Sequence, residues 1–437
     1  SSEPAMSPDG RFVAFSSSAD NLVTGDTNKA QDVFVRDLQS GTTTLVSVNS
    51  SGTGPGNKDS YAPVVGAGGR YVLFRSKATD LAAGPSGYNA EHFFLRDLQS
   101  SATYCLQNGT ATSGTTADLP TAMTPDGRFI LFGAPDPFNH SCLYLWDVQA
   151  ARRVYTNTLF STNRMLTSLS LQSIAITPDG QKLAYAFTCE NTCYLFAAKL
   201  ALQTATQIET STGPYSSLHL SADGRYLVCN RTASAASNKQ VYLYDLQTAT
   251  RALVSRRYDS LAEANGASDA PDLSPDGRFV LYHGTATDLV AGDTNGVPDI
   301  FLYDRQSGLN NLLSASRVGG APNNRSLNPC FSPDGQTLAF QSWASDLMAG
   351  DFNHNGDVFA YTLLTLSMLP ATSPGQGPWL CWPRVPGKSY RVQFKTSLAD
   401  PAWRDVSGSI STQGTKAFLR DLAPAPTQKF YRVVAFE

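Results

Sequence analysis

The sequence is poor in histidine and cysteine, and it lacks the motifs of several common enzyme classes. Its 437 residues include only five histidines and seven cysteines. No Gly-x-Ser-x-Gly elbow, His-Glu-x-x-His pair or phosphate-binding loop occurs. These absences argue against an α/β-hydrolase, a zinc protease of the His-Glu-x-x-His type and a P-loop enzyme. Paired carboxylates for glycoside cleavage stay open, because such a pair need not be local in sequence.

An excess of charge of one sign is also missing. The 33 Lys and Arg residues nearly balance the 36 Asp and Glu residues, for a net charge of −3. No basic block is present to follow a phosphate backbone, so nucleic acid is not an expected partner. No run of about 18 apolar residues occurs, so no transmembrane segment is expected.

Composition also bears on location. Ser, Thr, Asn and Gly are abundant and Lys is sparse, which favours a secreted or periplasmic protein. The sequence begins at Ser1 rather than at a methionine. We therefore expect that a signal peptide has been removed.

What the sequence has in abundance is one turn motif, whose best copy is Ser-Pro-Asp-Gly-Arg at 274–278. Proline presets the first corner of a turn, and Asp-Gly supplies an acceptor and a residue that can adopt positive φ. The aspartate, or Gly68 in a worn copy, recurs at positions 9, 68, 126, 179, 223, 276 and 334. The chain is therefore a repeat protein with units of 44 to 59 residues.

Each repeat reads as a four-stranded antiparallel meander. The turn lies between two strands, and a third follows, as in Val-Phe-Val-Arg-Asp at 33–37. After a polar turn a fourth strand comes, as at 43–47. Seven such meanders predict an all-β fold, a seven-bladed β-propeller.

The Ser-Pro-Asp-Gly-Arg turn with the downstream Phe-Val-Arg-Asp-Leu strand resembles the TolB-like, WD-type propeller repeat of bacterial proteins. The resemblance covers about residues 1–366. It implies the propeller fold and says little about function, because this fold hosts peptidase-gating domains, lyases and plain binding scaffolds alike.

A second, smaller domain is expected at the C-terminus. Four strand patterns there predict a small β-sandwich. Through Pro386–Gln393 and Phe430–Val433 it resembles the fibronectin-like C-terminal modules of secreted bacterial proteins, which implies attachment or spacing. The predicted boundaries are 1–368 for the propeller, 369–378 for a Pro/Gly linker and 379–437 for the sandwich.

The seventh blade lacks the polar turn that should precede its fourth strand, near Leu364–Met368. Either residues upstream of Ser1 supply that strand, or the blade keeps three strands and the C-terminal module covers its edge. We expect the second arrangement, because an uncovered edge invites pairing with another chain.

The loops between the second and third strands of blades one, six and seven carry oxygen ligands with Asp-x-Asn-x-x-x-Asp spacing. This spacing is typical of the first half of a calcium loop, and the seventh-blade loop adds an Asn at i+4. The predicted structural Ca²⁺ ligands are Asp26, Asn28, Asp32, Asp293, Asn295, Asp299, Asp351, Asn353, Asn355 and Asp357. The alternative is that these residues only form turns.

Register predicts a polar pocket on the propeller axis. His219 and Asp272 occupy the same place in adjacent inner strands and could pair, although a satisfied core histidine is the alternative. Residues at the loop ends of the second strands would rim the pocket. The predicted lining is Arg75, Asn230, Arg231, His283, Gln341, Trp343, His219 and Asp272, suited to a small ligand, a peptide or a sugar.

One cysteine pair is informative, namely Cys189 and Cys193 across a short hairpin. A disulfide is favoured there over a free pair. Zinc would need two further ligands, and no other such pair is nearby in sequence.

These features favour a non-catalytic extracytoplasmic binding or scaffold protein, with a protein or glycan partner on the loop face of the propeller. The alternative is a polysaccharide-active enzyme, a hydrolase or lyase that uses the central pocket.

Overall fold

The computed structural model is all-β, with two short 3₁₀ turns at Ala67–Gly69 and Leu200–Leu202. It describes residues 1–437 apart from 84–90, 107–119, 136–140, 159–168, 233–237, 352–354, 365, 370–376, 386, 398–401, 415, 423–428 and 437. In the described part of the chain, no helix has the length and apolar character needed to cross a membrane. The chain forms two compact units, 1–329 with 343–355, and 330–342 with 356–437.

The first unit contains six four-stranded antiparallel sheets, and each uses four strands that are consecutive in the chain. The first two sheets are β1 (Ser2–Met6), β2 (Phe12–Ser17), β3 (Asp32–Asp37), β4 (Thr42–Leu45), and β5 (Ser60–Val65), β6 (Tyr71–Ser76), β7 (His92–Asp97), β8 (Ala102–Cys105). The next two are β9 (Thr121–Met123), β10 (Phe129–Pro135), β11 (Ser141–Asp147), β12 (Arg152–Thr158), and β13 (Leu169–Ile176), β14 (Lys182–Cys189), β15 (Thr192–Lys199), β16 (Thr204–Ser211). The last two are β17 (Tyr215–Leu220), β18 (Tyr226–Thr232), β19 (Lys239–Asp245), β20 (Thr250–Leu253), and β21 (Ser268–Leu273), β22 (Phe279–Gly284), β23 (Asp299–Asp304), β24 (Leu309–Leu312).

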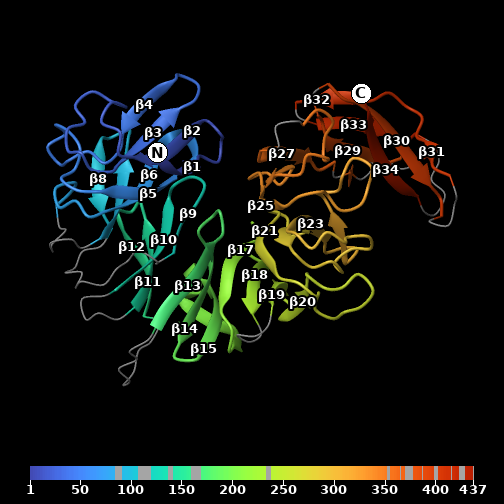
Figure 1. Cartoon of the computed structure of the whole chain (residues 1–437), viewed down its shortest axis with the longest axis horizontal. Helices are drawn as coiled ribbons and strands as arrows, with labels where there is room; N and C mark the ends of the chain where they lie inside the picture. The colour runs from blue at the N-terminus through green and yellow to red at the C-terminus, as the bar shows by residue number, and fades with distance from the viewer. Residues whose placement is uncertain are drawn as a thin grey trace. The chain divides into compact units, whose positions relative to one another are not determined.

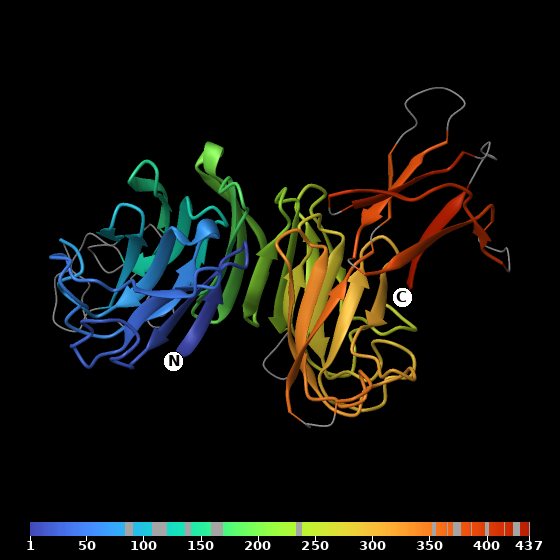
Figure 2. The same ribbon diagram turned by 90° about the horizontal axis from the view of Figure 1, so that it is seen from above.

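Successive sheets of this unit pack face to face, as propeller blades do. The strands of the fifth sheet follow one another outward from β17 to β20 (Figure 1), and the sheets run in chain order from blue to yellow (Figure 2). Each sheet buries both faces: in β22, Leu281 and Tyr282 are adjacent and both fully buried. A strand between two packed sheets is expected to bury both of its faces in this way.

The seventh sheet has three strands in the described part of the chain, namely β25 (Ser326–Phe331), β26 (Thr337–Ser342) and β27 (Asp357–Thr362). The division between the two units runs through it. The next strand, β28 (Ser367–Leu369), pairs instead with β29 (Trp379–Pro383). The sequence that was expected to end the propeller therefore contributes to a C-terminal sheet.

Two antiparallel sheets form the C-terminal part of the second unit. One has the order β28-β29-β33-β32, with β33 at Lys416–Arg420 and β32 at Ser411–Gln413. The other has the order β31-β30-β34, with bounds Arg404–Asp405, Ser389–Lys395 and Phe430–Phe436. The sheets share one core, whose buried members are Leu380, Trp382, Val392, Val406, Ala417 and Leu419.

The repeated turn folds as predicted. Glycines 10, 69, 127, 180, 224, 277 and 335 all adopt positive φ, between 61° and 73°. In the fifth sheet, Ser221 Oγ donates to Asp223 at 2.6 Å and accepts from the Tyr226 amide at 2.9 Å. The aspartate side chain also accepts from the Arg225 amide at 2.9 Å.

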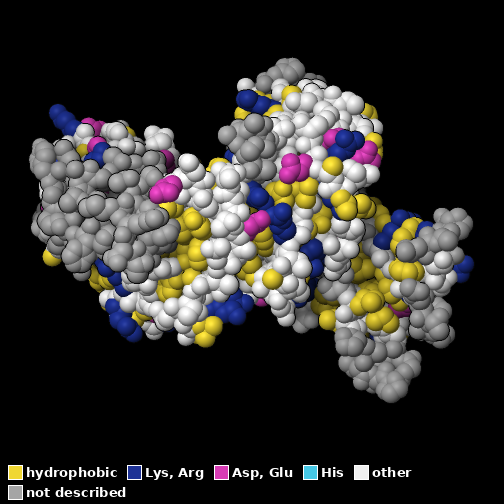
Figure 3. Space-filling model, turned by 90° about the horizontal axis from the view of Figure 1, so that it is seen from below, with side chains coloured by type: hydrophobic (Ala, Val, Ile, Leu, Met, Phe, Trp, Pro, Cys, Tyr) yellow, Lys and Arg dark blue, Asp and Glu magenta, His cyan; other side chains and the backbone are white. Residues whose placement is uncertain are grey.

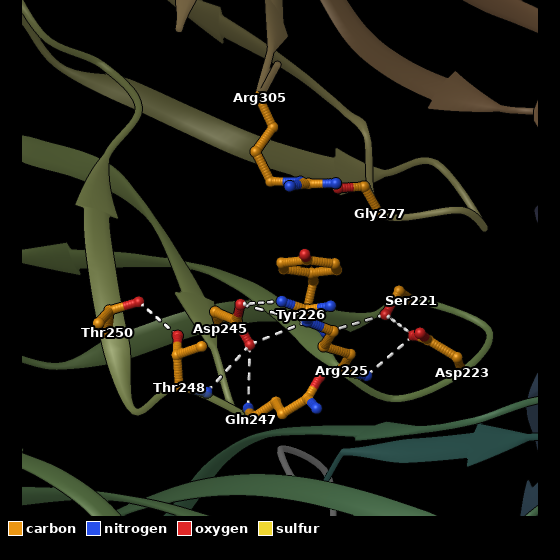
Figure 4. Close-up of polar contacts among 10 residues, drawn as sticks. All are labelled: Ser221, Asp223, Arg225, Tyr226, Asp245, Gln247, Thr248, Thr250, Gly277 and Arg305. Atoms are coloured by element: carbon orange, nitrogen blue, oxygen red, sulfur yellow. Dashed lines mark hydrogen bonds and ion pairs between the residues drawn. The ribbon is translucent and has the colours of Figure 1, made fainter.

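In five of the seven repeats an arginine follows the turn and ties it to the end of the third strand. Arg225 donates to both carboxylate oxygens of Asp245, at 2.7 Å from Nη2 (Figure 4). Its guanidinium also covers the Tyr226 ring at 4.9 Å. The same ion pair joins Arg11–Asp37, Arg70–Asp97, Arg128–Asp147 and Arg278–Asp304.

In four of the motifs the aromatic residue, Phe12, Tyr71, Phe129 or Tyr226, packs under the glycine of the next turn. Tyr226 lies beneath Gly277 of the sixth sheet, and Arg305 covers its ring at 4.2 Å while donating to the Gly277 carbonyl at 2.9 Å (Figure 4). Glycine is required there, because an added Cβ would lie 2.4 Å from the tyrosine ring. The motif therefore joins neighbouring sheets as well as reversing the chain.

The predicted Cys189–Cys193 disulfide is wrong: both cysteines are free and buried. The hairpin register pairs Cys189 with Thr192 and Cys193 with Thr188, so the two side chains leave opposite faces of the sheet. Cys189 joins the core between the third and fourth sheets, and Cys193 joins the core between the fourth and fifth.

Candidate functional site between the fifth and sixth sheets

A polar cluster lies where the fifth and sixth sheets meet, at the ends of β18, β19, β21 and β22. Lys239 Nζ lies 2.7 Å from Asp269 Oδ2, and the Asn230 amide donates to Asp269 Oδ1. His283 is the cross-strand partner of Asp269. We call Asn230, Lys239, Asp269 and His283 the axial cluster.

A β-bulge brings this cluster together. Asp269 and Asp272 are three residues apart, yet they pair with His283 and Leu281, which are two apart. Ala270 absorbs the extra residue with φ of 48°. Both aspartates therefore lie on the same side of β21, whereas simple alternation would place them on opposite sides.

The second aspartate, Asp272, contacts a histidine of the neighbouring inner strand β17. His219 Nδ1 lies 3.3 Å from Asp272 Oδ1, with the imidazole side chain 47% exposed. This pairing was predicted, because His219 and Asp272 occupy equivalent places in adjacent inner strands. The exposure argues against the alternative of a buried core histidine.

Burial and charge oppose each other in the axial cluster. Burial raises the pKa of Asp269, but the bonds from Lys239 and the Ala270 amide outweigh it and leave that pKa lowered. Burial lowers the pKa of His283, against the attraction of Asp269. Near neutral pH the cluster thus holds an ionised aspartate beside a neutral imidazole.

Two polar atoms of the cluster have no hydrogen-bond partner among the described residues. They are Oδ1 of the fully buried Asn230 and Nδ1 of His283. Asp269 and Lys239 side chains, at 40% and 37% exposure, open the cluster to solvent. A buried acceptor without a donor is costly, so a ligand hydroxyl or an ordered water would be favourable here.

The other predicted pocket residues do not join this cluster. Arg231 follows Asn230 on β18 and points the opposite way, where its Nη1 lies 3.1 Å from Glu209 of the fourth sheet. Arg75 lies 3.5 Å from Glu91 and covers the Phe93 ring.

The two predicted pocket residues of the seventh blade fall in different units. Trp343 belongs to the first unit and stacks under Arg325 at 4.4 Å, whereas Gln341 of β26 belongs to the second unit.

Sequence reasoning missed Lys239 and Asp269. One signal was available for Asp269. Asp269 occupies the position in its inner strand that Ser2, Tyr61 and Ser216 occupy in theirs. Asp269 is charged, whereas those three residues are not. Lys239 gives no comparable signal, because it is found only through the packing of two sheets.

The predicted calcium loops contain two kinds of residue. Some hold the loop in place through hydrogen bonds, and others have a role that such bonds do not explain. In the first sheet, Asp32 accepts from Ser47 at 2.6 Å and from Asn28 at 2.8 Å, and Asn28 also donates to the Gly56 carbonyl at 2.7 Å. The sixth sheet repeats this arrangement with Asp299, Ser314, Asn295 and Pro322. These bonds tie the loop to the next connection, so the Asn and the second Asp already have partners.

The first aspartate of each loop is different. Asp293 is 3% exposed, and its Oδ1 has no hydrogen-bond partner in the described residues. Oδ1 of Asp351 likewise has no hydrogen-bond partner among them. Burial, then the charge of Asp20, raises the pKa of Asp26. Asn353 lies outside the described residues, and Asn355 and Asp357 fall in different units.

Within the described residues, no three His, Cys, Asp or Glu side chains are grouped to hold a metal ion. A calcium ion at these loops would therefore use backbone or amide oxygens besides carboxylate.

A hollow of about 900 Å³ between the fourth and fifth sheets is a weaker candidate site. Charged groups of its lining already have partners: Arg251 pairs with Glu209, and Lys182 Nζ donates to the Asp223 backbone carbonyl at 2.5 Å. On the face drawn in Figure 3, described cations and anions are likewise interspersed. The axial cluster is preferred because it has unpaired buried polar atoms.

No protein-family model matches the chain, and no curated protein matches it. Solved structures with a similar fold include the β-propeller domain of the Trilobed protease from Pyrococcus furiosus, at 9% identity and TM-score 0.46, covering 78% of this chain and 90% of that one. TolB from Acinetobacter baumannii is 14% identical with TM-score 0.34, covering 69% and 63%. Oligogalacturonate lyase in complex with manganese is 11% identical with TM-score 0.44, covering 83% and 88%. Identities this low do not transfer a function.

Proposed function

We propose that this chain is a non-catalytic binding protein, a seven-bladed propeller followed by a β-sandwich, that binds a hydroxyl-bearing ligand such as a glycan at the axial cluster. The observation that carries the proposal is the buried Asn230 Oδ1, which has no donor among the described residues, next to the solvent-open Lys239–Asp269 pair. A hydroxyl group can donate to the amide oxygen and accept from lysine. An extracytoplasmic location belongs to the proposal and rests on composition.

The alternative, a polysaccharide-active enzyme, would need one carboxyl that stays protonated to act as a general acid. Asp269 and Asp272 lie on the same side of β21 and are the pair to consider. The pKa of Asp269 is lowered, which is the wrong direction for an acid. Asp272 is engaged with His219. Binding is therefore favoured over turnover.

A glycan array followed by calorimetry on the bound glycan tests this proposal. Lys239→Gln should weaken binding at least about tenfold, since a hydrogen bond to a charged group is worth about 1.5–3 kcal/mol. Asn230→Ala should weaken it about fivefold, since a neutral hydrogen bond is worth about 0.5–1.5 kcal/mol. Lys199→Gln, an exposed lysine of the fourth sheet, is the control and should bind as the natural protein does. Unchanged affinity in both cluster variants would contradict the site, and release of reducing ends would favour the enzyme.

We also propose that the first aspartates of the three loops, Asp26, Asp293 and Asp351, hold structural calcium. The support is a buried carboxylate oxygen, in two of the loops, that has no hydrogen-bond partner in the part of the chain the structure describes. A cation satisfies that oxygen and offsets the burial that raises the pKa of Asp293.

Calcium should therefore raise the melting temperature, because a ligand at 100 times its Kd that binds only the folded state adds about 2.7 kcal/mol. Asp293→Asn should remove part of the shift between chelator and millimolar calcium. Asp276→Asn, in a turn at the other end of the same sheet, should keep all of it. Equal melting temperatures with chelator and calcium would leave these residues as turn formers.

A further inference from the structure

The outer face of the sheet β31-β30-β34 combines cations with aromatic rings. On β30 and β34, Val392 and alternate residues point into the core shared with β29 and β33. The intervening residues point the other way, together with Trp403, which precedes β31. The face consists of Arg391, Gln393, Lys395, Trp403, Asp405, Arg432, Val434 and Phe436.

The rings hold the cations in place. The Arg432 guanidinium lies 4.5 Å from the centre of the Trp403 ring, and Lys395 Nζ lies 5.0 Å from it. The Arg391 guanidinium lies 5.8 Å from the centre of the Phe436 ring. Stacking of this kind fixes the orientation of the cation.

The polar contacts within the face leave it positively charged. Arg432 donates through Nε and Nη2 to Gln393 Oε1 at 2.9 and 2.7 Å, so a neutral amide orients it. Among its described residues the face carries three cations and one acid, Asp405, which lies 3.9 Å from Arg391 with both side chains more than half exposed. The chain as a whole is acidic, with a net charge of −3.

The same face also exposes hydrophobic side chains to solvent. Val434 is 39% and Phe436 44% exposed, next to the cations. Arg391 and Lys395 are four residues apart on one strand, which separates their backbones by about 13 Å. A small anion cannot reach both, so the face fits a ligand that repeats its negative charge.

We propose that this face binds an acidic polysaccharide. The cations bind its carboxylates, and Val434 and Phe436 contact the apolar faces of its sugar rings. A single strand of nucleic acid fits less well, because its bases need open aromatic rings and the Trp403 ring is covered by cations. The surface is separate from the axial cluster and does not depend on the function proposed for it.

Affinity electrophoresis of the full chain through gels with alginate, a polyuronate, tests the proposal in calcium-free buffer. Alginate should retard the natural protein, and neutral dextran should not. The double variant Arg391→Gln with Arg432→Gln should bind alginate about tenfold more weakly, since each exposed charge pair contributes up to about 1 kcal/mol. Raising the salt concentration should weaken the binding.

Lys416→Gln, an exposed lysine on β33 of the other sheet, removes the same kind of charge and should bind alginate as the natural protein does. Neutral dextran carries hydroxyl groups and no carboxylates, so its lack of retardation separates this result from glycan binding at the axial cluster. Equal binding by the double variant with an unchanged melting temperature would overturn the proposal. Equal or stronger retardation by single-stranded DNA or polyglutamate would overturn the choice of a polysaccharide.

Discussion

Gly277→Ala should lower the free energy of unfolding of the first unit by about 2–4 kcal/mol, whereas Gly10→Ala should lower it by about 1 kcal/mol. Both glycines have positive φ, 68° and 72°, so both variants carry the cost of a left-handed alanine. Only at Gly277 does the new Cβ meet another residue, 2.4 Å from Cδ2 of Tyr226. Nothing lies within 4 Å of the Cβ at Gly10. The difference between the variants is therefore the steric cost at the joint between two sheets.

Tyr226 cannot relieve the overlap easily, because Arg225 and Arg305 cover its ring at 4.9 and 4.2 Å (Figure 4). Urea denaturation of both variants measures the difference. A double-mutant cycle with Tyr226→Ala isolates the contact, since the smaller side chain makes room for the Cβ. Equal losses for Gly277→Ala and Gly10→Ala would mean that the turn glycines serve the chain reversal alone.

The turn itself was predictable from sequence because Pro-Asp-Gly has a local physical meaning. The ion pair from the turn to the third strand was also readable, although it was missed. Where Gln181 replaces the arginine, Lys199 stands in place of the aspartate, and where Gln336 replaces it, Thr362 does. The two residues of the pair are lost together, which is the sequence signal of a contact.

The β-bulges could not be predicted in the same way. The residues with positive φ in the inner strands include Ala62 and Ala270, and alanine has no local preference for that conformation. Packing between the sheets imposes it. The bulge sets which residues lie on the same side of the strand. The ion pair of Asp269 with Lys239 of the fifth sheet was therefore missed. The contact between His219 and Asp272 lies on the other side of the bulge and was predicted.

The same limit explains the cysteines. Spacing alone suggests that Cys189 and Cys193 meet across a hairpin. The turn holds only Glu190 and Asn191, so each cysteine pairs with a threonine and the two point to opposite faces. A difference of one residue in register decides between a disulfide and two separate cores.

Trp382→Ala should unfold the C-terminal part of the second unit and leave the first unit intact. Trp382 is 1% exposed and forms the centre of the core shared by the two C-terminal sheets, with Tyr390 packed edge-on at 5.7 Å. Removing a buried tryptophan costs about 3–5 kcal/mol, which is comparable to the stability of so small a core. Trp382→Phe is the control. It keeps an aromatic ring, and the indole Nε1 has no hydrogen-bond partner among the described residues, so no bond is lost.

Hydrogen exchange measured by mass spectrometry reads the two units separately. In Trp382→Ala, protection should fall in β29, β30, β33 and β34 and stay unchanged in β18 and β22, because the core of the fifth and sixth sheets has no member from the C-terminal sheets. Trp382→Phe should keep protection in both regions. Loss of protection in β18 and β22 together with the C-terminal strands would show that the two cores unfold as one cooperative unit.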